Sequence, residues 1–227
     1  MVAAASEARA VLAGAGFSGD VPKAWGFVRA SDEIDLLLCG VGKANASGAT
    51  AQAIAHRAPS RVLNLGICGA LPHAQPLQIG QAILASRCLF ADEGIETTND
   101  WIPLAKAGFP AAIDADSITP SESFNRLLRP LADRVGVVTT VSSCSGTDAR
   151  AEEIASRSAP DGLAEAMEGA AIGLAAARAN IPFAELRVVS NRTGDRESQG
   201  WNLPLALARL ERIAAELAAI LSRSSAG

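Results

Sequence analysis

Residues 61–70 read RVLNLGICGA, and this stretch decides how the chain is expected to fold. The apolar residues of 61–65 predict a strand, and the glycines at 66 and 69 predict a tight turn over residues 64–70. Before it, Pro59 ends an alanine-rich helix predicted over 44–58. After it, the long apolar stretch at 81–90 predicts another strand. The segment is therefore one unit in a chain of alternating helices and strands.

The same alternation continues on both sides. Further strands are predicted at 25–29, 34–39, 135–141 and 183–190, and helices at 7–15, 121–133, 148–156, 168–179 and 203–221. Residues 92–120 contain three prolines and are predicted to be a loop with one short helix. This order predicts an α/β fold, a three-layer helix–sheet–helix with a central mixed, largely parallel twisted sheet. No linker or repeat divides residues 1–227, so we expect a single domain.

The composition excludes several classes of protein. Of the 227 residues, 49% are hydrophobic and 19% are charged, which is unlike a disordered chain. The net charge is −4, whereas nucleic acids and anionic membranes attract a basic face. No apolar run reaches the roughly 18 residues that span a bilayer, and the first residues lack the basic region of a signal peptide. We therefore expect a cytoplasmic protein with a small-molecule ligand and neither a nucleic-acid nor a membrane partner.

The cysteines give no sign of a metal site. Cys39, Cys68, Cys88 and Cys144 are widely spaced, without a CxxC pair or a neighbouring pair of histidines. We expect them to be reduced and mostly buried thiols, and we expect no metal ion and no cofactor.

Two glycine motifs resemble nucleotide-binding loops but lack the required context. Residues 14–19 read GAGFSG, which matches GxGxxG, but a helix is predicted before them where a dinucleotide site needs a strand. Residues 40–43 read GVGK, the end of a P-loop, but Leu37 and Ala44 replace its first glycine and its hydroxyl residue. The second loop does follow a predicted strand and open a helix, where backbone amides hold an anion or a water molecule.

Polar side chains follow other predicted strands, where α/β proteins bind their ligands. Residues 165–171 read EAMEGAA, whose acids either complement the dipole of the following helix or accept hydrogen bonds from hydroxyl groups such as those of ribose. Residues 190–196 read SNRTGDR and form either a solvated turn or a ligand-binding loop. Glu7 is the only acid of the first predicted helix, and is either an ordinary first-turn acid or a functional one.

Taken in order, four of these segments resemble the purine nucleoside phosphorylase and nucleosidase superfamily. They are GVGK at 40–43, NLGICGA at 64–70, EAMEGAA at 165–171 and SNR at 190–192, and the resemblance extends over residues 2–221. Within that superfamily, ADEGIET at 91–97 and GWNLP at 200–204 are similar to the futalosine hydrolase family. That family hydrolyses the N-glycosidic bond of futalosine and releases hypoxanthine on a route to menaquinone. The resemblance implies the same activity, no cofactor and a homo-oligomer.

The resemblance also implies which residues hold the nucleoside. Met167 and Glu168 line the ribose, and Glu168 accepts hydrogen bonds from its 2′- and 3′-hydroxyl groups. Asn191 meets the base, where adenine-specific relatives carry aspartate and relatives acting on 6-oxopurines carry asparagine. An amide donates to O6 or N7 of such a base. Asn191 therefore predicts hypoxanthine rather than adenine as the leaving base.

Two further positions favour hydrolysis over phosphorolysis. Phosphorylases of this superfamily carry arginine at the position of Asn64 and a hydroxyl residue near Ile67, so a phosphate dianion would lack its charged partner here. Gly66 and Ile67 are then expected to line the substrate. Nucleosidase relatives use an early glutamate to activate water, and Glu7 is the early glutamate of this chain.

The remaining site residues are predicted for the edges of the substrate. Ser143 and Cys144 lie on a loop that the resemblance places along the purine, and Trp201 either closes over the site or packs in the core. Arg192 is a candidate for the carboxylate tail of futalosine, as are Arg196 and Lys43.

Three other functions stay open. One is a nucleosidase for methylthioadenosine or S-adenosylhomocysteine, against which Asn191 argues, and another is a purine nucleoside phosphorylase, against which Asn64 argues. The third is a nucleoside sensor that binds without turnover.

Overall fold

A computed structural model describes residues 1–72, 77–113 and 115–225. Among these residues the central sheet has six strands: β3 (Val62–Ala70), β4 (Ala82–Phe90), β7 (Ser117–Ile118), β8 (Arg134–Thr140), β9 (Gly162–Ala166) and β10 (Phe183–Arg192). The pairs β10–β3, β4–β8 and β8–β9 are parallel, whereas β3–β9, β4–β10 and β4–β7 are antiparallel. The sheet is therefore mixed, as the sequence predicts. Because β4 pairs with both β8 and β10, the sheet curls back onto itself.

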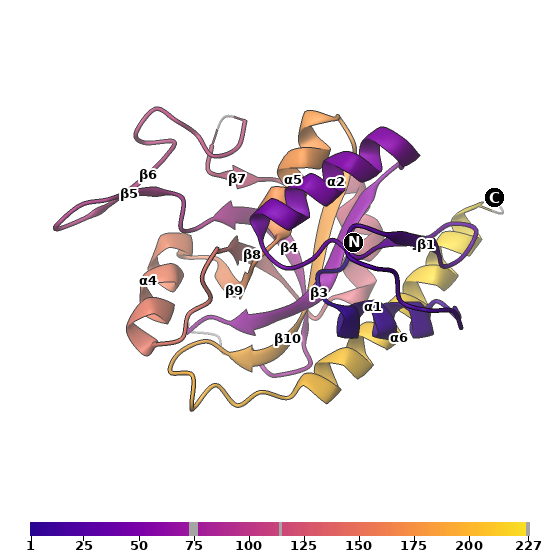
Figure 1. Ribbon diagram of the computed structural model, residues 1–227. Helices are drawn as coiled ribbons and strands as arrows, with labels where there is room; N and C mark the ends of the chain where they lie inside the picture. The colour runs from indigo at the N-terminus through magenta and orange to yellow at the C-terminus, as the bar shows by residue number, and fades with distance from the viewer. Residues whose placement is uncertain (73–76, 114, 226–227) are drawn as a thin grey trace.

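Helices cover the sheet on both sides, which confirms the predicted fold class (Figure 1). They are α1 (Ala5–Gly14), α2 (Lys43–Arg57), α3 (Glu122–Leu128), α4 (Asp148–Ser158), α5 (Gly169–Arg178) and α6 (Leu203–Ser225). Helices α2 and α5 pack together on one side, and α1 and α6 pack together on the other (Figure 1). Pro130 shortens the helix predicted over 121–133, so that α3 ends at Leu128 and a 3₁₀ turn follows at Arg129–Leu131.

Strand β4 shows how the two sides share one sheet. Ile83 belongs to the apolar cluster that includes Ile172 of α5, and Leu84 belongs to the cluster that includes Leu210 of α6. Successive side chains of a strand point to opposite faces, so residues 82–85 of β4 are apolar because both faces of the strand are buried there.

Two expectations for the elements are wrong. The segment 64–70 is not a turn after a strand but lies within β3, because its glycines serve close approach of neighbouring groups rather than chain reversal. In residues 92–113 and 115–120 the structure has no helix. It has the hairpin of β5 (Gly94–Glu96) and β6 (Trp101–Pro103), followed by β7.

The strands of the structure differ from the predicted ones in two further ways. The strands predicted at 25–29 and 34–39 are present as the shorter antiparallel pair β1 (Phe27–Arg29) and β2 (Asp35–Leu37). Strand β9 is not predicted at all, because its sequence GLAEA carries no β-branched or aromatic residue.

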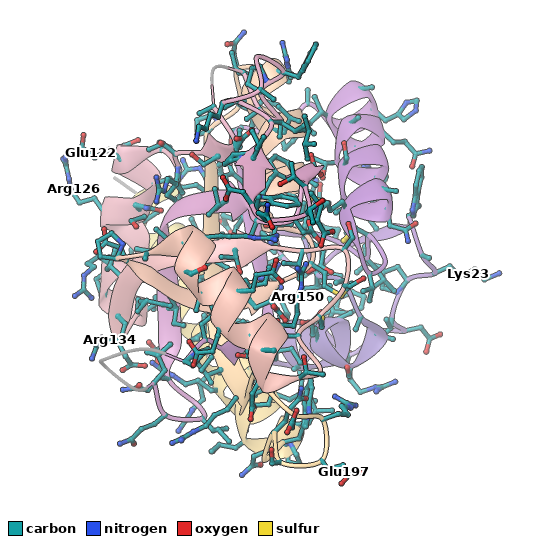
Figure 2. All side chains as sticks on the ribbon, turned by 90° about the vertical axis from the view of Figure 1, so that its left-hand side faces the viewer. Lys23, Glu122, Arg126, Arg134, Arg150 and Glu197 are labelled. Carbon is teal, nitrogen blue, oxygen red and sulfur yellow. The ribbon has the colours of Figure 1, made fainter. Side chains whose placement is uncertain are left out.

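Charged side chains of both signs project from the surface (Figure 2). Glu122 and Arg126 form an exposed ion pair one turn apart on α3, and Glu197 lies on the loop between β10 and α6. Over the described residues, no helix has the length and apolar character to cross a membrane.

Candidate active site

A cavity of about 510 Å³ opens where the ends of β3, β9 and β10 meet the start of α1. The sequence-predicted residues Glu7, Ile67, Met167, Glu168 and Asn191 all line it. They come from four different segments of the chain, and the fold brings them together at the ends of strands, where an α/β sheet offers space for a ligand.

Glu7 is held at the cavity wall by backbone amides. Its Oε2 accepts hydrogen bonds from the N–H groups of Ala3 (3.0 Å) and Ala4 (2.8 Å), and its Oε1 accepts one from Ile67 (2.8 Å). Burial raises the pKa of the Glu7 carboxyl, and the charge of Arg187 and these amides oppose that shift. Glu7 is thus a buried carboxylate whose basicity is increased and whose position is fixed.

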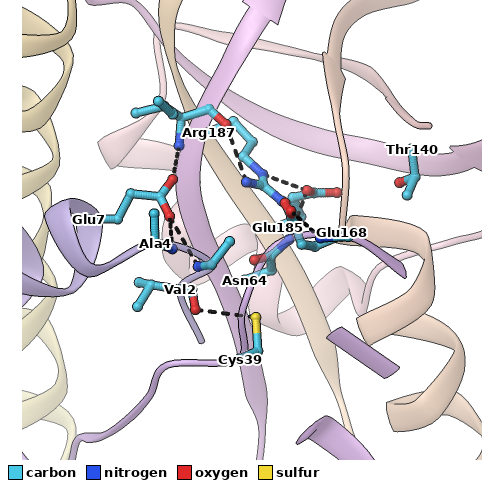
Figure 3. A network of polar contacts seen from close by, with 12 residues as sticks. Val2, Ala4, Glu7, Cys39, Asn64, Thr140, Glu168, Glu185 and Arg187 are labelled. Carbon is cyan, nitrogen blue, oxygen red and sulfur yellow. Dashed lines mark hydrogen bonds and ion pairs between the residues drawn. The ribbon is translucent and has the colours of Figure 1, made fainter. Parts of the chain in front are cut away.

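Arg187 is the centre of the polar network beneath the cavity (Figure 3). This buried guanidinium donates from Nε to Glu185 (2.7 Å), from Nη2 to Glu168 (3.0 Å) and from Nη1 to the carbonyl of Ile67 (3.2 Å). Burial alone would lower its pKa, but Glu185, Glu168 and Glu7 together raise it. Arg187 therefore stays charged and neutralises the carboxylates that surround it.

Glu168 lies at the end of α5 that faces the cavity. Its Oε1 accepts a hydrogen bond from the N–H of Gly42 (3.1 Å), and its Oε2 accepts from Arg187. The loop at 40–43 thus holds an anion at the start of α2, as its position predicts, and the anion is the carboxylate of Glu168. Fixed by two donors from different segments, the carboxylate keeps one orientation.

Glu185 supports this arrangement from below. It accepts hydrogen bonds from Asn64 Nδ2 (2.9 Å) and Cys88 Sγ (2.9 Å) as well as from Arg187. A methyl group on Gly169 would lie 2.0 Å from Glu185 Oε2, so only glycine fits at the start of α5. Sequence reasoning missed both Glu185 and Arg187. The available signal was two charges within an apolar strand, since buried charges are rare unless they pair.

Asn191 enters the cavity at an irregularity in β10. The register of β10 against β3 shifts between Val189 and Asn191, as at a bulge that redirects a side chain. Asn191 Oδ1 accepts from Ser190 Oγ (2.9 Å), and Nδ2 donates to the carbonyl of Arg192 (2.8 Å). The amide therefore retains one N–H on Nδ2 for a ligand.

The loop before α4 contributes a wall that differs in register from the prediction. Cys144, Ser145 and Gly146 line the cavity, whereas Ser143 is exposed and is not part of the lining. Burial, with Glu165 nearby, raises the pKa of the Cys144 thiol to about 11, so this cysteine stays protonated at neutral pH. Ser145 is held by Glu165, which accepts from both its N–H (2.7 Å) and its Oγ (2.5 Å).

Gln199 links the loop before α4 to the loop after β10 at the outer side of the cavity, and it was not predicted from the sequence. Its Nε2 donates to the carbonyls of Ser145 and Gly194 (2.9 Å each), and its Oε1 accepts from Trp201 Nε1 (2.8 Å) and Arg196. Trp201 lines the cavity while remaining half-exposed, and Arg196 lies 5.1 Å from its ring centre. Trp201 is therefore a wall residue at the mouth of the cavity rather than part of the core.

The cationic candidates separate clearly in the structure. Arg196 lines the cavity, Arg192 is exposed and lies outside the lining, and Lys43 pairs with Asp92 (2.5 Å) and Glu93 (3.0 Å). Only the first of these three candidates is placed to meet a ligand in the cavity.

Gly66 lies beneath the cavity lining and makes the buried network possible. A methyl group there would lie 2.6 Å from Glu7 Oε1 and 2.7 Å from Arg187 Nη1. We predict that Gly66→Ala lowers the free energy of unfolding by about 1–3 kcal/mol, because two charged groups must move. Urea denaturation tests this. Gly146→Ala is the matched control, because a methyl group there meets nothing within 4 Å, and an equal loss in both variants would contradict the account.

Comparisons with known proteins identify the family of this chain. Residues 24–224 match the family model described as the phosphorylase superfamily. The chain is 38% identical to the futalosine hydrolase of Acidothermus cellulolyticus, over all of this chain and 92% of that protein. Two solved structures from Helicobacter pylori share the fold at 21% identity. Futalosine hydrolase has a TM-score of 0.75, with 98% of this chain and 95% of that chain covered. A mutant 5′-methylthioadenosine/S-adenosylhomocysteine nucleosidase with 5′-methylthioadenosine in its active site has a TM-score of 0.76, with 98% and 96% covered. The chain belongs to the phosphorylase superfamily and, within it, to the futalosine hydrolase family.

Proposed function

We propose that this chain hydrolyses the N-glycosidic bond of futalosine, releasing hypoxanthine and leaving dehypoxanthine futalosine, as a step of menaquinone synthesis. One observation carries the proposal most directly. A single cavity is lined by three groups that suit this reaction. Glu7 is a buried acid that can act on water, Glu168 is a fixed carboxylate for the ribose, and Asn191 offers an amide to the base. The likeness to a futalosine hydrolase over the whole chain supports the choice of substrate.

Glu168 is proposed to bind the ribose. Its two oxygens each accept one hydrogen bond within the protein, and a carboxylate oxygen accepts a second. The 2′- and 3′-hydroxyl groups can therefore donate to a carboxylate that is already oriented, and each charge-assisted bond contributes about 1.5–3 kcal/mol. The same negative charge stabilises the oxocarbenium-like ribose that forms as the glycosidic bond breaks. Met167 lies next to it on the cavity wall.

Glu7 is proposed to activate the attacking water. Its carboxylate accepts a proton from the water, whose oxygen bonds to C1′ while the bond from C1′ to N9 breaks. The electron pair of that bond passes to the purine, which takes up a proton from solvent and leaves as neutral hypoxanthine, while Glu7 returns its proton to solvent. Asn191 donates its remaining Nδ2 hydrogen to the departing purine at N7 or O6, which stabilises the charge that develops there.

Water rather than phosphate is the proposed nucleophile. Asn64 is buried and donates to Glu185, so it is not available to a phosphate group. Arg187 is the cation nearest the catalytic groups, and it is already bonded to two carboxylates. A phosphate dianion entering beside Glu7 and Glu168 would meet negative charge, and the guanidinium that contacts Glu168 is already paired.

We also propose that the protein acts in the cytoplasm as a homo-oligomer. Its four free cysteines, three of them buried, suit a reducing compartment. Large apolar side chains are exposed on and beside the β5–β6 hairpin, at Ile95, Phe109 and Ile113, where a second copy of the chain would cover them.

The direct test is release of free base from futalosine, inosine and 5′-methylthioadenosine, each with and without phosphate. We expect hypoxanthine from futalosine at a rate that phosphate does not change. Glu168→Gln should abolish turnover, while Glu211→Gln, an exposed site on α6, should leave it unchanged. Release of adenine would instead indicate a methylthioadenosine nucleosidase. Strict dependence on phosphate would indicate a phosphorylase, and tight binding without turnover would indicate a sensor.

The pH profile tests the role of Glu7. Because burial raises its pKa above the 4.5 of an unburied glutamate, the carboxylate form is lost at a higher pH than usual. We therefore predict that kcat/KM for futalosine falls as the pH is lowered through this raised pKa. Glu7→Gln should reduce kcat/KM by about 10²–10⁴-fold and remove this acid limb. A limb that persists unchanged in Glu7→Gln would assign the titration to another group.

A further inference from the structure

One buried carboxylate in the cavity wall has no part in the mechanism above. Glu165, at the end of β9, is nearly inaccessible to solvent and lines the cavity. Its protein partner is Ser145, whose N–H donates to Oε1 and whose Oγ donates to Oε2. Each oxygen of the carboxylate therefore keeps capacity to accept another hydrogen bond. A buried acid with spare acceptor capacity at a ligand cavity calls for a donor on the ligand.

The sheet places Glu165 directly across from Asn191. In the register of the sheet, Asn191 of β10 is opposite Gly69 of β3, and Gly69 is opposite Glu165 of β9. Residues paired in this way point to the same face, and two strand spacings separate the outer residues by about 9.5 Å. Gly69 has no side chain, and a methyl group on it would lie 2.9 Å from Thr193 Cγ2 and 3.3 Å from Asn191 Nδ2. A slot in the cavity wall thus lies between a carboxylate and an amide, bounded by Gly69 and by the methyl group of Thr193, which also lines the cavity.

We propose that Glu165 accepts a hydrogen bond from N1–H of the purine, while Asn191 donates to its O6 or N7. The inference rests on the proposed function, because it assigns the purine to this slot. A 6-oxopurine carries a hydrogen on N1 and an acceptor at O6, which complements a carboxylate and an amide donor. Adenine has a lone pair on N1, which faces the Glu165 oxygens without a hydrogen between them. Glu165 and Asn191 therefore select the same class of base from two sides.

The hydrogen bonds from Ser145 favour the form of Glu165 that accepts. Burial raises the pKa of its carboxyl, and the two hydrogen bonds from Ser145 counteract this by stabilising the charged form. These bonds also orient the carboxylate, because Gln199 holds the carbonyl of Ser145 from the other side.

A purely structural role for Glu165 would be to hold the loop that contains Ser145. The two roles predict different results. Loss of a loop anchor weakens binding of every base alike, whereas loss of the N1–H acceptor weakens hypoxanthine binding and leaves adenine binding equal or stronger. The ratio of the two dissociation constants is therefore the readout that separates them.

The test is titration calorimetry of hypoxanthine and adenine with the full-length protein. Wild type should prefer hypoxanthine, and Glu165→Gln should reduce that preference by about tenfold or more. Ser145→Ala is the matched control. It removes one donor to Glu165 but keeps the carboxylate, so it should weaken both bases in similar proportion. An unchanged preference in Glu165→Gln, or an equal change in Ser145→Ala, would overturn the proposal.

A second measurement needs no variant. Wild type should bind 1-methylhypoxanthine, which lacks the N1 hydrogen, at least about tenfold more weakly than hypoxanthine. Equal binding of the two bases would overturn the proposal even if Glu165→Gln does not fold. Because these assays use free bases, they also separate the two proposals. Futalosine cleavage without Glu165-dependent preference refutes this inference alone, and the preference without cleavage refutes the proposed function alone.

Discussion

The buried guanidinium of Arg187 is the group on which the rest of the site depends. A charge removed from water is costly, and it is tolerated only when partners of opposite charge and good geometry surround it. Arg187 meets this condition with Glu185, Glu168 and the carbonyl of Ile67. Several local features follow from this cluster. Gly66 and Gly169 leave the space that the charged groups occupy, and Asn64 donates to Glu185, which Arg187 and Cys88 also reach.

This cluster explains how the cavity can hold acidic groups in fixed positions. Glu168 is bonded by Arg187 and by the N–H of Gly42, and Glu7 is bonded by three backbone amides, one of them from Ile67. Because Ile67 also accepts from Arg187, the two carboxylates are linked through the same strand. In the proposed mechanism, groups held in this way need not reorganise when a ribose cation forms between them, and such preorganisation is the main source of electrostatic catalysis.

Much of the fold could be predicted from periodicity, and the failures have physical causes. The strands β4 and β10 could be predicted from their apolar residues, because both faces of these strands are buried over most of their length. The glycines of 64–70 suggest a turn, yet they lie in β3, where side chains from other segments come too close to the backbone to leave room for a Cβ atom. This close approach depends on the tertiary structure and has no signal in the local sequence. Strand β9 was equally hidden, because short alternation of small residues is weak evidence for a strand.

The candidate site shows the same division. Glu168 and Asn191 could be found because they belong to segments that resemble a known family, and Glu7 because nucleosidase relatives use an early glutamate. Arg187 and Glu185 could not be placed in this way, since the sequence of β10 does not show that Arg187 pairs with Glu168 of another segment. The contacts of Glu165 and Gln199 with Ser145 can be recognised only in the structure, where β9 and the segment after β10 meet the loop before α4.

The most direct test of the Arg187 cluster is the free energy of unfolding of Arg187→Met with and without Glu168→Gln. Arg187→Met should lower it by about 3–5 kcal/mol, because it leaves Glu168 and Glu185 buried without their counter-charge. Adding Glu168→Gln to that variant should then recover part of the loss, since one uncompensated charge is removed. If the second substitution instead destabilises the Arg187→Met protein as much as it destabilises wild type, the two groups act independently and the account is contradicted.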